Sequence, residues 1–232
     1  NKGTGEVISG QGIIPEGFQH YILKYDDNSA YPYAKLEYVY YRMALDAGIE
    51  MMPSELRTYD GVTHFLTQRF DREGNEKIHT QTLAAMLPTS DSYEDIFSVI
   101  RRLNLPYEDS RQHFLRMVFN VTTRNVDDHS KNFSFCMNKK GIWRLSPAYD
   151  LTYSVDLTAP AYSNRHSLTI NGKNEDITRE DLGTVGQNND IQDYNALIDT
   201  VYNAVAKFES HARELRIDEK LIKSIQEDFI KV

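Results

Sequence analysis

The sequence of 232 residues predicts an α+β fold in two unequal lobes. Two observations carry this prediction. Strand-like alternation and tight turns dominate residues 1–72, whereas apolar residues at helical spacing dominate residues 73–232. Hydrophobic residues make up 40% of the chain, which is enough for a sizeable core. We therefore expect a small lobe built on strands, ending in a hinge near residue 72, and a large, mostly helical lobe after it.

The small lobe is expected to contain a strand, a helix and a hairpin. Tyr21–Tyr25 is an apolar run interrupted by Lys24, which is either a surface lysine at a sheet edge or a functional cation. Residues 33–47 place apolar side chains on one helical face, and Gly48 follows as a C-terminal cap. Glu37, near the helix start, either interacts with the helix dipole or pairs with Lys24. Strands at 55–59 and 62–68 flank Asp60-Gly61, a strong hairpin signal.

The first nineteen residues are rich in glycine. A phosphate-binding loop would explain glycines, but these are irregularly spaced and no strand–glycine–strand pattern frames them. Scattered glycines are a weak signal, so we interpret this segment as a hairpin loop or linker.

The large lobe is expected to be helical, with one hairpin. Helices are predicted at 80–87 and at 92–103, the second capped by Ser92 with Asp95 three residues later. Pro106 begins a long apolar helix, and a hairpin follows at 133–145. Residues 152–190 are polar and rich in turn signals, including Asn171-Gly172. Apolar stripes predict two C-terminal helical regions, the last capped by Asp218.

The most informative stretch is Asn125–Asn132, a polar loop between the long helix and the hairpin. It places Asp127 five residues before Asn132, and Asp150 follows the hairpin. One carboxylate can accept a hydroxyl proton, while an amide oxygen and a second carboxylate can hold magnesium against ATP phosphates. A cluster of caps and turns is the plain alternative. A zinc site at Asp127, Asp128 and His129 is weakly supported, because spaced His or Cys ligands are missing.

These motifs, N-x-D-D-H-x-K-N-F followed by P-A-Y-D-L, resemble the catalytic core of HipA-type toxin serine/threonine kinases. The resemblance extends from about Tyr21 onward and implies a two-lobed protein-kinase-like fold with a truncated small lobe. It implies Asp127 as the catalytic base and Asn132 as a magnesium ligand. Asp150 would take the role of the Asp in the D-F-G motif of ordinary kinases. Lys24 would contact the α- and β-phosphates and pair with Glu37.

The resemblance assigns further residues to the nucleotide. Gln68, Arg69 and Phe70 belong to a segment like the family's R-F-D-R, which joins the lobes, and their backbone groups would bind adenine. Lys131 would offset charge on the γ-phosphate, with a solvated lysine as the alternative. His129 and Tyr149 are also placed at the nucleotide site, with His129 expected to support the loop by hydrogen bonds. Residues 152–190 would form the substrate-binding surface.

The resemblance implies an ATP- and Mg²⁺-dependent transfer to a protein hydroxyl, in this family on translation components such as an aminoacyl-tRNA synthetase. It also implies a small DNA-binding antitoxin as partner. The net charge of −8 argues against direct nucleic-acid binding by this chain alone. A single cysteine, Cys136, fits a reducing cytoplasm, and no apolar run is long enough for a bilayer.

Two other functions stay open, a small-molecule phosphotransferase and a non-catalytic docking module. Nothing in the sequence matches the family's Gly-rich loop with its regulatory serine. We therefore expect a fragment that lacks the start of the small lobe, and its activity alone stays open.

Overall fold

The computed structural model describes residues 1–26, 31–156, 160 and 164–230. The strand-rich part begins with β1 (Tyr21–Lys24), α1 (Tyr33–Asp46), β2 (Ser54–Tyr59) and β3 (Val62–Gln68). These strands form an antiparallel sheet in the order β1-β3-β2, with Tyr21 opposite Gln68 and Tyr59 opposite Val62. The predicted turn at Asp60-Gly61 is confirmed, since both residues have positive φ, at 49° and 82°.

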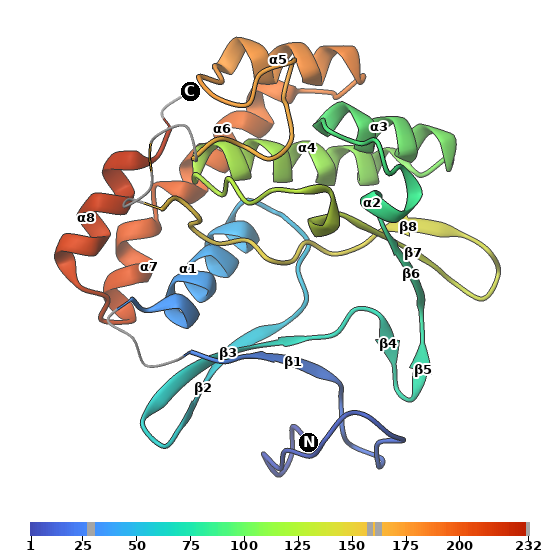
Figure 1. Cartoon of the computed structure of the whole chain (residues 1–232), viewed down its shortest axis with the longest axis vertical. Coiled ribbons are helices and arrows are strands. Elements are labelled where there is room, and N and C mark those ends of the chain that lie inside the picture. The colour runs from blue at the N-terminus through green and yellow to red at the C-terminus, as the bar shows by residue number, and fades with distance from the viewer. Residues whose placement is uncertain (27–30, 157–159, 161–163, 231–232) are drawn as a thin grey trace.

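Helix α1 lies between the sheet and the helical part of the molecule (Figure 1). It packs against β2 and β3 on one side and against α6 and α7 on the other. Its predicted apolar face is fully buried, and Gly48 adopts φ of 74° just past its end, as expected of a C-terminal cap. Because α1 contacts both parts, it fixes the sheet relative to the helices.

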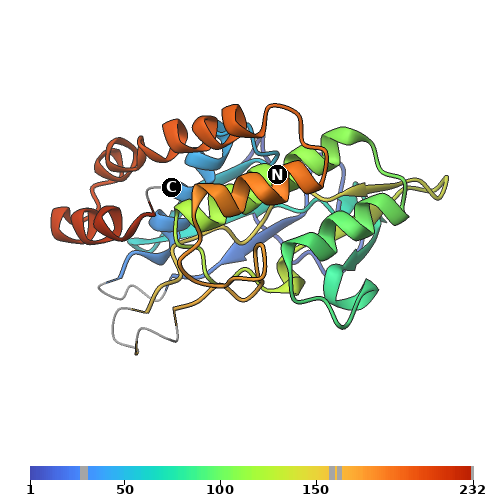
Figure 2. The same ribbon diagram turned by 90° about the horizontal axis from the view of Figure 1, so that it is seen from above.

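The helical part is built around a nearly completely buried helix, α4 (Tyr107–Thr122). Figure 2 shows α4 running beside α6 (Tyr194–Val205), with α3 (Tyr93–Arg102) on its other side. The predicted capping box at Ser92 and Asp95 is present at the start of α3. The remaining helices are α5 (Arg179–Asn188), α7 (Phe208–Glu214) and α8 (Glu219–Asp228), and Asp218 caps α8 as predicted.

A second sheet lies within the helical part and corrects one prediction. Strand β6 (His79–Thr82) pairs with β7 (Ser134–Met137), which pairs with β8 (Trp143–Leu145). The helix predicted at 80–87 is therefore wrong in its first half: Thr80–Thr82 are strand, and only α2 (Leu83–Met86) is helical. Pairing with a strand more than 50 residues away overrides the local preference. A small hairpin, β4 (Arg72–Glu73) and β5 (Glu76–Lys77), precedes β6.

The polar stretch 152–190 also differs from its expectation, because it contains the helix α5 near its end. A Thr178–Asp181 capping box starts this helix, a signal that was readable in the sequence. The turn at Asn171-Gly172 is confirmed by positive φ at both residues. Residues 157–159 and 161–163 of this stretch lie outside the described residues.

The glycine-rich N-terminal segment lies on the face of the first sheet that carries Tyr21, Leu23 and Leu66. Alternate residues of a strand point to opposite faces, so Ile22 and Lys24 face the other way. The segment is held at Ile14, whose N–H donates to Asn75 Oδ1 at 2.7 Å. Its position supports a linker rather than a loop around phosphates bound near Lys24. Among the described residues, no helix combines the length and apolar character needed to span a membrane.

Candidate active site

An ion-pair cluster joins the first sheet, α1 and the loop after β8. Lys24, the last residue of β1, places its Nζ 2.6 Å from Glu37 Oε1 and 2.5 Å from Asp150 Oδ1. The Glu37 side chain is only 12% exposed, whereas those of Lys24 and Asp150 are 36% and 44% exposed. The predicted pairing of Lys24 with Glu37 is therefore present. One ammonium group brings together three segments that are far apart in the sequence.

The electrostatics of this cluster keep its lysine charged. Burial opposes the charge on Lys24, but attraction to Glu37 and Asp150 outweighs it and raises the pKa of Lys24 above its usual value. Burial also raises the pKa of Glu37, and Lys24 offsets this effect only in part. A negatively charged ligand entering here would compete with these carboxylates for a permanently positive group.

A cavity of about 350 Å³ opens beside the cluster. Its volume falls within the range of small-molecule sites, which are typically apolar with a few convergent polar groups. Lys24, Glu37 and Asp150 line its polar end. Its other walls come from the sheet, from the loop before β2, from the segment after β3, and from the loop before Asp150: Ile22, Phe65, Thr67, Met51, Met52, Gln68, Arg69, Phe70, Asp71, Thr80, Ala148 and Tyr149.

The segment Gln68–Phe70 forms one wall, but not all its backbone groups are available. The Gln68 N–H donates to the Pro53 carbonyl at 3.0 Å, and the Arg69 N–H donates to the His20 carbonyl at 2.9 Å. The Gln68 carbonyl faces Pro53 in the ladder, and proline has no N–H to donate. The Gln68 and Arg69 N–H groups are therefore already engaged, which leaves the carbonyls of Gln68 and Arg69 and the backbone of Phe70 as the groups that could meet a base.

The side chains of this segment are also engaged. Arg69 forms a salt bridge with Asp71 at 2.5 Å, which lowers the pKa of Asp71 despite partial burial. The Phe70 ring lies 5.5 Å from the Tyr149 ring at a tilt of 32°. The wall is therefore rigidly tied to the loop that leads to Asp150.

The loop between α4 and β7 carries Asp127 and Asn132. Its last residues form the short 3₁₀ turn η1 (Ser130–Asn132). Asn132 Nδ2 donates to the Asp127 carbonyl at 2.8 Å, so within the described part of the chain the amide oxygen of Asn132 stays available as an acceptor. The Asp127 side chain is 65% exposed and faces solvent. The loop thus offers one exposed carboxylate beside one oriented amide oxygen.

Asn132 and Asp150 line the same narrow recess beneath this loop. Asp150 adopts φ of 59°, a left-handed conformation that Asp tolerates better than most residues. The described residues contain no group of three or more His, Cys, Asp or Glu side chains that could hold a metal. One carboxylate and one amide oxygen suit Mg²⁺ nonetheless, because Mg²⁺ usually completes its coordination with phosphates and water.

Three further predicted residues surround this recess. The Tyr149 hydroxyl donates to the Lys131 carbonyl at 2.7 Å and lies 2.6 Å from Ser134 Oγ, so it holds η1 against β7. The side chain of Lys131 is exposed. His129 Nε2 lies 3.7 Å from Asp127 Oδ1, and its buried Nδ1 has no partner among the described residues. Among the described residues, the His129 side chain therefore makes no hydrogen bond to the loop, and His129 supports it through its carbonyl, which accepts from the Asn132 N–H at 2.8 Å.

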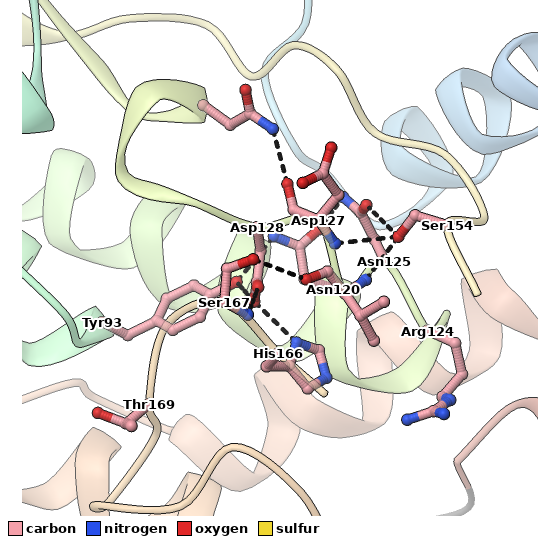
Figure 3. A network of polar contacts seen from close by, with 12 residues as sticks. Tyr93, Asn120, Arg124, Asn125, Asp127, Asp128, Ser154, His166, Ser167 and Thr169 are labelled. Carbon is pink, nitrogen blue, oxygen red and sulfur yellow. Dashed lines mark hydrogen bonds and ion pairs between the residues drawn. The ribbon is translucent and has the colours of Figure 1, made fainter. Parts of the chain in front are cut away.

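The support comes instead from Asp128, which sequence analysis did not single out. Figure 3 shows its carboxylate turned inward, away from Asp127. Asp128 is 1% exposed; its Oδ2 accepts from the Tyr93 hydroxyl and from His166 Nδ1, and its Oδ1 accepts from the Ser167 N–H, each at 2.7 Å. Asp127 and Asp128 thus point in opposite directions, which removes the basis for a zinc site at Asp127, Asp128 and His129.

Two serines fix the same loop from the chain that follows Asp150 (Figure 3). Ser154 Oγ accepts from the N–H groups of Val126 and Asp127, at 2.7 and 3.0 Å. Ser167 Oγ donates to the Val126 carbonyl at 3.1 Å. Ser154 and Ser167 therefore both hold the backbone at Val126 and Asp127.

The family model described as "HipA-like C-terminal domain" matches residues 6–229, nearly the whole chain.

The chain belongs to the HipA-like C-terminal domain family.

Two solved structures and one curated relative resemble this HipA-like domain. HipA of Shewanella oneidensis MR-1, solved with HipB and its operator DNA, has a TM-score of 0.70 at 17% identity and is matched over 95% of this chain and 63% of its own. The Helicobacter pylori proinflammatory kinase CtkA has a TM-score of 0.53 at 12% identity, and the match covers 86% of this chain and 92% of CtkA. The fold is therefore kinase-like, with a small strand-rich lobe and a large helical lobe.

The curated relative is named "Putative kinase Y4mE" and comes from Sinorhizobium fredii. It is 28% identical over 130 residues, which cover 49% of this chain and 31% of the relative. The matched segment thus spans about a third of the length of that protein.

A polar stripe on α4 explains how the HipA-like domain holds its site together. Asp109, Gln112, Arg116 and Asn120 follow one another at intervals of three or four residues, which places them on one helical face, and all are at most 3% exposed. Each is bonded to a different segment: Asp109 to Arg144 and Leu145 of β8, Gln112 to Gly48 and Glu50, Arg116 to Ser146, and Asn120 to Asn125 and Tyr93. Sequence analysis treated α4 as an apolar helix and missed these residues.

Replacing Lys24 by Met should weaken nucleotide binding. The change leaves Glu37 and Asp150 without their shared cation, and we expect a loss in Mg-ATP affinity on the order of tenfold, comparable to one charge-assisted contact. Isothermal titration would measure it. Lys35→Met is the matched control, because Lys35 lies on α1 without an ion pair to these carboxylates among the described residues. Equal losses in both variants would show that Lys24 has no specific role.

Proposed function

We propose that this HipA-like domain is an ATP- and Mg²⁺-dependent serine/threonine protein kinase. The observation that carries the proposal is the Lys24–Glu37–Asp150 cluster at the polar end of the cavity, next to a loop that presents Asp127 and Asn132. Phosphoryl transfer requires chiefly positioning and charge stabilisation, and these residues can supply both. The kinase-like fold and the family membership support the same reaction.

In this proposal each residue has a defined part. Asp127, whose side chain is exposed, accepts the proton of the acceptor hydroxyl. Asn132 and Asp150 provide oxygen ligands for Mg²⁺, which would neutralise charge on the phosphates. Lys24 binds the α- and β-phosphates, Lys131 reaches the γ-phosphate, and His129 lies beside Asp127 as a further polar contact.

Adenine binding is assigned to the wall of the cavity formed by Gln68, Arg69 and Phe70. The carbonyls of Gln68 and Arg69 and the Phe70 N–H are the groups that can bond the base, and the Arg69 side chain forms a salt bridge with Asp71. The rings of Phe70 and Tyr149 cover one side. We accordingly divide the chain into residues 1–72, the nucleotide-binding lobe with its hinge, and residues 73–232, the catalytic lobe.

We further propose a toxin–antitoxin setting in the cytoplasm. The Shewanella HipA was solved with HipB and operator DNA, and this favours a small DNA-binding antitoxin as partner here. The net charge of −8 leaves DNA contacts to that partner. The acceptor would be a protein, with translation components as the first candidates from the family resemblance.

The test is magnesium-dependent binding followed by transfer. We expect ATP to raise the melting temperature of the protein in the presence of Mg²⁺ and to do so less in EDTA, because the metal joins Asn132 and Asp150 to the phosphates. Incubation of cell extract with labelled ATP and the protein should then label a polypeptide, identified by mass spectrometry.

The other outcomes separate the alternative functions. Label only in small molecules would indicate a small-molecule phosphotransferase. An absence of both nucleotide binding and label would indicate a docking module and would reject the kinase proposal.

A further inference from the structure

The most unusual buried group in the molecule is the guanidinium of Arg116. The residue is 3% exposed, and within the described chain its only hydrogen bond runs from Nη2 to the Ser146 carbonyl at 2.7 Å. Its Nε is buried without a partner. Burial lowers the pKa of Arg116 to about 10, although attraction to Glu50 and Asp109 offsets it in part, so the group is still positive at neutral pH. Buried charges are normally paired, because leaving water costs several kcal/mol.

The position of Arg116 suggests a reason for keeping this charge. Arg116 lines the narrow recess beneath the loop together with Asn132 and Asp150, the two proposed metal ligands. Asp128 lines the same recess, so two carboxylates already lie there before any ligand binds. A polyphosphate would bring further negative charge to this end of the cavity. Lys24 provides a positive charge at the partly exposed side of this end of the cavity, and Arg116 provides a second positive charge from the protein interior.

We propose that Arg116 is an electrostatic positioning residue that stabilises the polyphosphate end of the nucleotide from behind the metal ligands. The inference rests on the proposed nucleotide binding. Arg116 acts through its field and through the carbonyl of Ser146, which begins the segment leading to Asp150. A fixed charge in a poorly hydrated recess acts strongly, because little water is present to screen it.

The test compares ligands that differ in charge but share the nucleoside. Isothermal titration measures the affinities of the wild-type chain, Arg116→Gln and Arg116→Lys for adenosine, ADP and ATP. The two nucleotides are titrated both with and without Mg²⁺. In Arg116→Gln we expect Mg-ATP affinity to fall roughly tenfold, with adenosine affinity unchanged within about twofold. Arg116→Lys keeps the charge and should preserve the preference for Mg-ATP over adenosine.

Gln112→Met is the matched control. Gln112 lies one turn earlier on the same buried stripe and bonds the backbone of Gly48 and Glu50 and, at 3.5 Å, Glu108 Oε1, so its loss removes these contacts without removing charge. It should lower the melting temperature while leaving the ratio of Mg-ATP to adenosine affinity unchanged.

The affinities of these variants decide whether Arg116 stabilises the polyphosphate or only the fold. The proposal would be overturned by a folded Arg116→Gln variant in which the affinities for Mg-ATP and adenosine fall by the same factor. It would also be overturned if neither affinity falls. If that variant does not fold, the lysine variant decides, since a loss of Mg-ATP preference with the charge retained would also overturn it. Wild-type protein that does not bind Mg-ATP would reject the kinase function itself, and this inference with it.

Discussion

Asp127→Ala should abolish phosphoryl transfer while ATP binding and stability stay near wild type. Its carboxylate is exposed and makes no close hydrogen bond among the described residues, so the fold does not depend on it. Removing a general base typically lowers the rate by about 10²- to 10⁴-fold. Single-turnover transfer measured under saturating Mg-ATP would report the loss, and titration of ATP into the same variant would show retained affinity.

Two further variants make this result specific. Asp127→Asn keeps the shape and the backbone contacts to Ser154 but cannot accept a proton, so it should be as inactive as the alanine variant. Glu227→Gln removes an exposed carboxylate on α8, outside the expected substrate-binding surface, and should transfer phosphate normally. Transfer at more than about a tenth of the wild-type rate by Asp127→Asn would contradict the assignment of the base.

Asp128→Ala should have the opposite effect, a large loss of stability. The substitution leaves the Tyr93 hydroxyl, His166 Nδ1 and the Ser167 N–H buried without their shared acceptor. Breaking such a buried network typically costs about 3–5 kcal/mol. For a domain of this size we expect the melting temperature to fall by roughly 10 °C, measured by circular dichroism or calorimetry.

The adjacent aspartate is the control for this experiment. Asp127→Ala changes the same residue type one position away and should shift the free energy of unfolding by about 0.5 kcal/mol or less, as exposed sites usually do. Equal stability of the two variants would mean that the inward network does not hold the loop.

Much of the architecture followed from local signals. The Asp60-Gly61 hairpin, the capping box of α3 and the cap of α8 depend on neighbouring residues, and each was predicted correctly. The pairing of Lys24 with Glu37 was one of two interpretations of Glu37, implied by the resemblance to kinases, and it is present. Roles for Asp127, Asn132 and Asp150 in catalysis and metal binding stay predictions.

Other features depend on contacts that the sequence does not reveal. Thr80–Thr82 became a strand because β7, far along the chain, pairs with it. The run Asp127-Asp128 gives no indication of which carboxylate faces inward, since that depends on His166 and Tyr93. The spacing of Asp109, Gln112, Arg116 and Asn120 was a readable signal, but the apolar residues of this helix alone were used to predict it.

The stripe on α4 constrains how this domain can change in length. Its four anchors share one helical face, and each added or removed residue turns the remainder of an α-helix by about 100°. An insertion between Asp109 and Asn120 would therefore release β8 or the Asn125 loop from its anchor, whatever residue is inserted. We therefore expect the number of residues between Asp109 and Asn120 to be fixed by the fold. The exposed turn at 138–141 holds no part of the site, and it should tolerate insertions and deletions.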